Sequence, residues 1–73
     1  MKSKEFLEVV APFQDKIYRL ARRLLVSGEE AQDATQEILL KLWTKRDEMA
    51  KYRSTEAFAI TMTKNYCYDK LKA

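Results

Sequence analysis

The stretch Ala31-Gln-Asp-Ala-Thr-Gln-Glu-Ile-Leu-Leu-Lys-Leu-Trp43 decides the fold, because its residues form two different faces of one helix. Four apolar residues recur at steps of three and four, as in the buried stripe of an amphipathic helix: Ala31, Ala34, Ile38 and Leu42. A second row recurs at helical spacing on another side: Asp33, Gln36, Glu37, Leu40, Lys41 and Thr44. A leucine within a polar row suggests that this side of the helix binds a partner. The alternative is an ordinary solvent-exposed face, on which a single exposed leucine is common.

The composition around this stretch favours helices throughout. The chain has 73 residues, near the lower size at which one apolar core suffices for a domain. Hydrophobic residues make up 47% and charged residues 34%, which is a globular balance. The chain has only one Gly and one Pro, the residues that most often mark turns, so a few long helices with few turns are expected. These features predict a single all-α domain.

Three helices are predicted, over Ser3–Val26, Glu29–Glu48 and Thr55–Lys72. Pro12 lies inside the first, so that helix is expected either to kink there or to restart with Pro12 in its first turn. The apolar residues of the first helix follow the same rhythm of three and four and are expected in the core: Phe6, Val9, Val10, Phe13, Ile17, Leu20, Ala21, Leu24 and Leu25.

The junctions between the helices carry capping signals. Ser27 with Glu30 forms a capping box before the second helix, and Gly28 eases the turn. The segment 50–55 is polar and aperiodic, which predicts a loop, and Ser54 or Thr55 is expected to cap the third helix.

The third helix also has an inner and an outer side. Phe58, Ala59, Met62, Tyr66 and Cys67 are predicted to face the core, whereas the other side carries Thr61, Lys64, Asn65, Tyr68, Asp69 and Lys72. The large ring of Trp43, at the end of the second helix, is expected to pack against the first or third helix, because a free aromatic residue of that size would be a sticky surface.

Charge is unevenly distributed along the chain. Residues 1–26 have a net charge of +3, residues 27–50 of −3, and residues 51–73 of +3. An acidic middle between basic ends suggests one surface for a basic protein partner and another for phosphates. The overall excess of +3 is too small for tight DNA binding by electrostatics alone.

Several functional classes find no support. Cys67 is the only cysteine and there is no histidine, so neither an intrachain disulfide nor a structural zinc site is expected. A lone, core-facing cysteine without a histidine base does not make a catalytic site, and no cofactor-binding motif is present. No segment reads as a signal peptide or a membrane span. A cytoplasmic protein that is not an enzyme is the resulting prediction.

Nucleic-acid binding has better support. Cations, aromatic residues and amides are mixed in the loop (Lys51, Tyr52, Arg53) and on the third helix (Lys64, Asn65, Tyr68, Lys70, Lys72). Single strands are held in this way, with cations along the backbone, aromatic faces stacked on bases and amides reading base edges. An ordinary basic helix with partly buried tyrosines remains the alternative.

The opening stretch also resembles a known family. Its pattern A-x-D-A-x-Q-E-[IV]-x-L-[KR]-L-W is similar to the second helix of the region 2 core domain of bacterial RNA polymerase sigma factors of the sigma-70 family, closest to the extracytoplasmic-function (ECF) type. In that family this helix docks on the clamp helices of the polymerase β′ subunit. The resemblance therefore implies polymerase contacts for the row defined above: Asp33, Gln36, Glu37, Leu40, Lys41 and Thr44.

The third helix resembles the sigma helix that ends in A-R-N-x-x-x-D-x-L-R. In ECF sigma factors that helix and the loop before it recognise the promoter −10 element on the non-template strand, and a flipped base is held in a loop pocket. By resemblance, Asn65 and Asp69 would lie near base edges, and Lys64 and Lys72 near phosphates. Lys51, Tyr52, Arg53 and Ser54 would lie near the pocket, and Thr61 and Tyr68 share the exposed side of the helix.

The chain also departs from the family pattern. Thr55 stands where an aromatic residue is common, Phe58 where Trp is frequent, and the segment 59–61 replaces a usual Leu-Tyr-Arg. The resemblance is therefore stronger for the polymerase-binding helix than for the DNA-reading one. It extends from about Phe6 to Lys72, and no part of the chain corresponds to the second, helix-turn-helix domain of the family. A fragment of a longer protein is expected in preference to a truncated gene product.

The sequence thus predicts a three-helix sigma domain that binds core polymerase and −10 DNA, with an anti-sigma factor as a further expected partner. One alternative is a helical module that binds polymerase or an anti-sigma factor without DNA. A regulator of double-stranded DNA is a second alternative, but the only Gly-containing turn precedes an acidic helix that is ill suited to phosphates. Asn65 has its own alternative role, a hydrogen bond to backbone at the seam where the helices pack.

Overall fold

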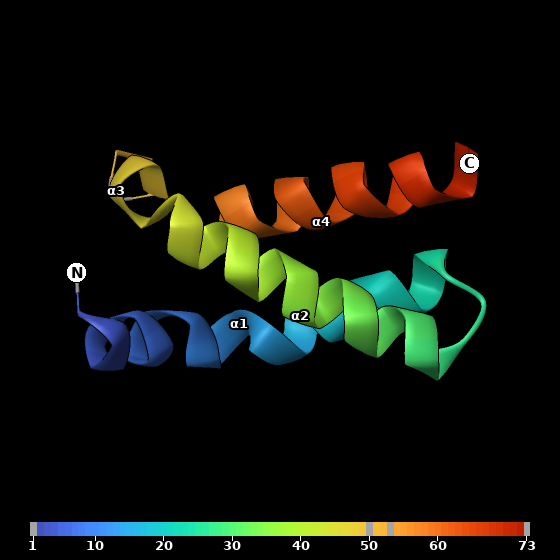
Figure 1. Cartoon of the computed structure of the whole chain (residues 1–73), viewed down its shortest axis with the longest axis horizontal. Helices are drawn as coiled ribbons and strands as arrows, with labels where there is room; N and C mark the ends of the chain where they lie inside the picture. The colour runs from blue at the N-terminus through green and yellow to red at the C-terminus, as the bar shows by residue number, and fades with distance from the viewer. Residues whose placement is uncertain (1, 50, 53, 73) are drawn as a thin grey trace.

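The computed structural model describes residues 2–49, 51–52 and 54–72. Within these residues there is no strand, which confirms the all-α prediction. The helices are α1 (Ser3–Leu24), α2 (Gly28–Thr44), the single-turn α3 (Arg46–Met49) and α4 (Thr55–Lys72). Helix α2 crosses in front of α1, and α4 runs beside both of them (Figure 1). No described helix combines the length and the apolar character needed to cross a membrane.

Helix α1 continues through Pro12, so of the two alternatives, a kink or a restart, the restart is wrong. Proline cannot donate a backbone hydrogen bond, and here the missing partner would be the carbonyl of Glu8. Pro12 is exposed, while Val10 and Phe13 on either side are buried in the core. Packing of the inner face therefore holds the helix together across the proline. The helix ends at Leu24, two residues before the predicted end, because Leu25 adopts an extended conformation.

Helix α2 begins as the sequence predicts. The Oγ of Ser27, the N-cap residue, accepts a hydrogen bond of 3.1 Å from the backbone N–H of Glu30. This confirms the serine half of the predicted capping box, which satisfies one of the free amide groups at the helix start. Glu29 and Glu30 in the first turn also complement the positive end of the helix dipole.

The predicted end of this helix at Glu48 is wrong, because the structure divides the segment into α2 and α3. Lys45 leaves the helical conformation after its N–H has bonded the carbonyl of Lys41, and α3 then starts in a new direction. This change of direction brings Met49 into the core, where it is almost fully buried. Burial of the methionine side chain explains why the longer helix is not continued. Three predicted helices thus become four.

The core lies between α1, α2 and α4. All four residues of the predicted α2 stripe are completely buried. From α1, Phe6, Val10, Phe13, Ile17 and Ala21 are buried, as predicted, while Val9, Leu20 and Leu24 are half-buried. Leu25, which follows α1, is buried as well. The ring of Trp43 meets that of Phe6 edge-on at 5.2 Å between centroids, which confirms its packing against the first helix.

Helix α4 has the predicted bounds. Ser54 caps it, because its Oγ accepts a hydrogen bond of 3.1 Å from the N–H of Ala57. Ala59 and Cys67 are buried as predicted, whereas Phe58, Met62 and Tyr66 are half-buried. Thr63 is also fully buried, which the sequence did not predict. Its hydroxyl donates to the carbonyl of Ala59 at 2.8 Å, so the polar atom is satisfied inside the helix.

Candidate functional site

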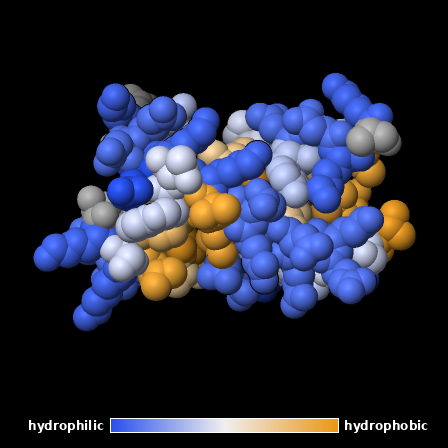
Figure 2. Space-filling model, in the orientation of Figure 1, coloured by the Kyte–Doolittle hydropathy of each residue, from blue (hydrophilic) through white to orange (hydrophobic). Residues whose placement is uncertain are grey.

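Five residues of α2 form what we term the outer face: Asp33, Gln36, Glu37, Leu40 and Thr44. All five are exposed. Leu40 remains 58% exposed, so it is not a member of the core. Within the described residues no cation lies within 4.0 Å of either Asp33 or Glu37, so both carboxylates are available to a partner. The side of the molecule on which α2 lies in front is mostly hydrophilic, with small hydrophobic areas (Figure 2).

A smaller cleft of about 200 Å³ adjoins this face, between α1 and α2. It is lined by amides and a carboxylate, including those of Gln14, Asp15 and Gln32, and by Gln36 of the outer face. The polar character of the outer face therefore continues toward α1.

Lys41 is exposed but lies apart from the rest of the predicted polymerase row. Its Nζ is 5.1 Å from the ring centroid of Tyr66 on α4, a cation–π distance. It lines a groove together with Lys45, the residue that directly follows α2. The position of Lys41 therefore places it on the α4 side of α2.

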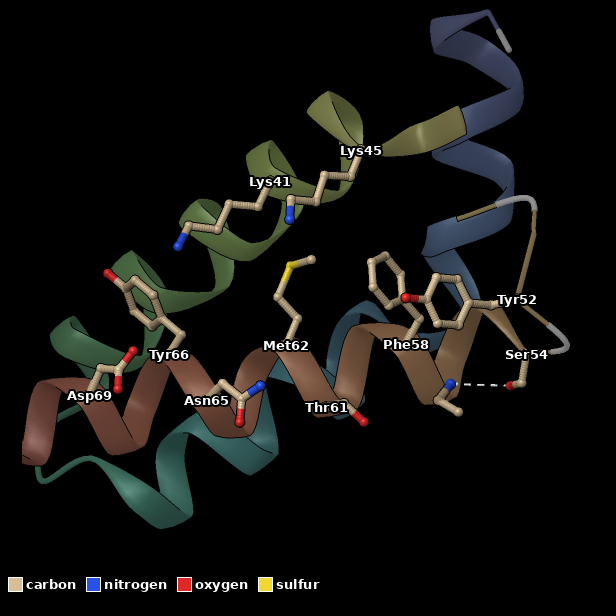
Figure 3. A pocket seen from close by; sticks show the side chains of 11 residues that line it. Lys41, Lys45, Tyr52, Ser54, Phe58, Thr61, Met62, Asn65, Tyr66 and Asp69 are labelled. Carbon is tan, nitrogen blue, oxygen red and sulfur yellow. Dashed lines mark hydrogen bonds between the residues drawn. The ribbon is translucent and has the colours of Figure 1, made fainter. Parts of the chain in front are cut away.

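The groove has a volume of about 570 Å³ and lies between the C-terminal half of α2 and the outer side of α4. Figure 3 shows the side chains of Lys41 and Lys45 extending from α2 over the space above α4. Its floor consists of Phe58, Met62 and Tyr66. These three residues were predicted to face the core, and each is half-buried because one side packs on the core while the other lines the groove.

The rim of the groove on α4 contains three of the predicted DNA-binding residues, Thr61, Asn65 and Asp69. All three are exposed. The alternative role for Asn65 was a hydrogen bond to backbone where the helices pack. Among the described residues the Asn65 amide makes no such bond. The amide is available to a ligand as both donor and acceptor.

An aromatic pair closes one end of the groove. The rings of Tyr52 and Phe58 stack at 4.3 Å between centroids, with 17° between their planes. Tyr52 is still 53% exposed, so much of its surface remains open to solvent. Ser54 also borders the groove, while its Oγ serves the N-cap of α4.

Other predicted DNA-binding residues are not in the groove. Lys64, Tyr68 and Lys72 are exposed on α4 but do not line it. Lys51 is exposed in the turn after α3, and its N–H bonds the carbonyl of Glu48. Arg53, and Ala50 of the predicted loop, lie outside the described residues.

Lys45 lines the groove, although the sequence did not predict a functional role for it. Its spacing of four from Lys41 was a usable signal, since residues four apart share a helix face. Only the packing of α4 against α2 reveals that this face borders the predicted nucleic-acid helix rather than solvent.

Cys67 is buried, and burial raises the pKa of its thiol, with the charge of nearby Lys70 acting in the opposite direction. A buried thiol that keeps its proton is a poor nucleophile, which agrees with its predicted structural role. Within the described part of the chain, no cluster of three or more cysteine or carboxylate ligands could hold a metal ion.

Comparison with protein families identifies one match. The model of the family described as Sigma-70 region 2 matches residues 9–73, which includes α2, the groove and α4. Comparisons with curated proteins and with solved structures found no match.

Proposed function

Because this chain belongs to the sigma-70 region 2 family, we propose that it acts in transcription initiation through two separate surfaces. The outer face of α2 binds the clamp helices of the β′ subunit of core RNA polymerase. Helix α4 and the turn before it bind the non-template strand of the promoter −10 element. The ECF subtype follows from the resemblance noted above, and a place in the cytoplasm from the sequence composition; both belong to the same proposal.

The single observation that carries the polymerase half is the exposed, acidic outer face with Leu40 at its centre. Two carboxylates that form no ion pair with any described residue, around an exposed leucine, suit a basic partner helix that contributes one apolar anchor. The carboxylates would govern association and orientation, while Leu40 would lose its contact with water on binding.

The DNA half rests on the groove and its rim. An exposed asparagine beside exposed lysines on one helix offers base reading and phosphate contact together. Extracting a base from the duplex costs a few kcal/mol, and stacking on protein returns a similar amount. The domain would thus stabilise open promoter DNA by holding unstacked bases, with no covalent step.

The polymerase half is tested by reversing charge at Asp33 and Glu37. The Asp33→Lys/Glu37→Lys double variant should lose binding to a β′ clamp-helix fragment while its helicity and melting temperature stay unchanged. Glu5→Lys/Glu8→Lys on α1 is the matched control, because it makes the same charge change at two exposed positions that do not belong to the outer face of α2. Equal binding by the first variant and the unmodified chain contradicts the assignment.

The alternative is an interaction module that binds polymerase or an anti-sigma factor without DNA, and the exposed Leu40 suits such a partner equally well. A binding assay with a labelled −10 non-template strand separates the two. The proposed function predicts weak, salt-sensitive binding that prefers this strand over its complement. Clamp-helix binding without any strand binding favours the alternative.

A further inference from the structure

We propose that Lys41 and Lys45 of α2 form the second wall of the nucleic-acid site, where their ammonium groups hold one backbone phosphate of a single strand. This inference rests on the proposed DNA binding and extends it to a helix that the sequence assigned to polymerase alone. It also changes the role of Lys41, which moves from the polymerase surface to the nucleic-acid surface.

The geometry supplies the first argument. Both lysines line the same groove as Thr61, Asn65 and Asp69, although they come from a different helix. The volume of about 570 Å³ lies within the range of roughly 300–1,000 Å³ that is typical of ligand sites. A nucleotide bound at the α4 rim would therefore have α2 as its opposite wall (Figure 3).

The charges supply the second argument. Among the described residues no carboxylate lies within 4.0 Å of Lys41 or Lys45. Asp69 is the only acidic residue of the lining, and Figure 3 places it beside Tyr66, whereas the Lys45 amine lies above Met62, nearer to Phe58. The Lys41 amine lies over Tyr66, toward Asp69, but no described carboxylate forms an ion pair with either lysine. The α2 side of the groove therefore favours an anion.

The floor explains why the anion would be part of a nucleotide. Phe58, Met62 and Tyr66 offer a half-buried apolar surface directly under the lysines. Aromatic floors with cations along one side are typical of single-strand sites, because every base has a face that can stack. A simple inorganic anion would gain nothing from this floor.

A structural role for the lysines is the competing explanation. Lys41 lies in the last turn of α2, where a cation complements the helix dipole, and its contact with Tyr66 adds a cation–π term. That role predicts a loss of thermal stability when the charge is removed, whereas a binding role predicts a loss of affinity at unchanged stability.

The test uses the whole chain with the double variant Lys41→Met/Lys45→Met, which keeps most of each side-chain stem and removes the charge. The matched control is Lys2→Met/Lys4→Met, because it removes two charges from exposed positions that do not line the groove. Affinity for a labelled −10 non-template strand is measured by fluorescence anisotropy over a range of salt concentrations. Binding to the clamp-helix fragment and the melting temperature are measured in parallel.

The expected result is about a tenfold weaker affinity for the strand in the groove variant and a near-normal affinity in the control. The slope of log affinity against log salt should fall by about 0.7, the value for one phosphate of a single strand. Clamp-helix binding should be unchanged, and Lys41→Arg/Lys45→Arg should retain strand binding because it keeps both charges.

Four results overturn the inference, and the last of them also overturns the proposed function. Unchanged strand affinity in the groove variant removes the lysines from the site while leaving the proposed function intact. Loss of clamp-helix binding with normal strand affinity returns Lys41 to the polymerase surface. A drop in melting temperature that accounts for the whole loss of affinity supports the structural role. Failure of the unmodified chain to bind the strand contradicts the DNA half of the proposed function itself, and the inference with it.

Discussion

At the scale of one residue, Trp43 links the end of α2 to the core. Its ring packs edge-on against Phe6 and lies under the guanidinium of Arg46, 4.1 Å from the ring centroid. We expect Trp43→Ala to lower the free energy of unfolding by about 3 kcal/mol, a large part of the stability of so small a domain. Urea unfolding followed by circular dichroism measures this. Tyr68→Ala, at a more exposed ring, is the control and should cost much less; an equal cost for both would contradict the packing role of Trp43.

The buried thiol of Cys67 should make the free energy of unfolding depend on pH. Burial raises the pKa of its thiol, so the folded state keeps the proton to a higher pH than the unfolded chain does. The contribution of the protonated thiol is therefore complete below the unfolded pKa and is lost as pH rises through the folded value. We expect the free energy of unfolding to fall above about pH 8.5 more steeply in the unmodified chain than in Cys67→Ala. Matching slopes for the two chains would show that the thiol does not titrate differently on folding.

Asn65 is the residue on which promoter discrimination depends most in this account. Its exposed amide can donate to and accept from a base edge, so Asn65→Ala should reduce discrimination between matched and mismatched −10 strands by about 1–3 kcal/mol. Lys64→Ala should weaken all strands alike, because a phosphate contact carries no sequence information. Competition binding with the two strands measures both effects. Lower thermal stability of Asn65→Ala with normal discrimination would return the residue to a structural role.

At the scale of the element, the start of α4 combines a cap with a binding surface. Ser54 caps the helix and borders the groove. Asp caps helices as well as Ser does, so Ser54→Asp should leave the melting temperature nearly unchanged while its negative charge weakens strand binding several-fold. Ser27→Asp, at the cap of α2 and away from the groove, is the matched control and should affect neither quantity. If both variants bind the strand equally well, the start of α4 does not contact DNA.

The helices differ in how well the sequence predicts them. The stripe in α2, the bounds of α4 and the two serine caps follow from local spacing and hydrogen bonding, and all were predicted. The break at Lys45 was not, because it depends on burial of Met49 against distant parts of the chain. Thr63 was missed for a related reason: a hydroxyl bonded within its own helix can be buried, and periodicity of apolar residues does not reveal it.

At the scale of the whole molecule, the outer face lies on one side of α2, and the groove lies between another side of α2 and α4. The sequence predicted two surfaces from its charge pattern and assigned residues to them by helical spacing. Spacing alone places a residue on a helix face but cannot say which neighbour borders that face. For this reason spacing groups Lys41 with the outer face and does not single out Lys45, whereas the packing of α2 against α4 places both in the groove.

Chemical-shift mapping of the isotope-labelled chain tests the central claim, that polymerase and DNA bind separate surfaces, most directly. Titration with the β′ clamp-helix fragment should shift the amide signals of Asp33, Glu37 and Leu40. Subsequent addition of the −10 non-template strand should shift those of Thr61 and Asn65 while the first set stays in place. Strand-induced shifts on the outer face of α2, or displacement of the clamp helices by the strand, would contradict the account.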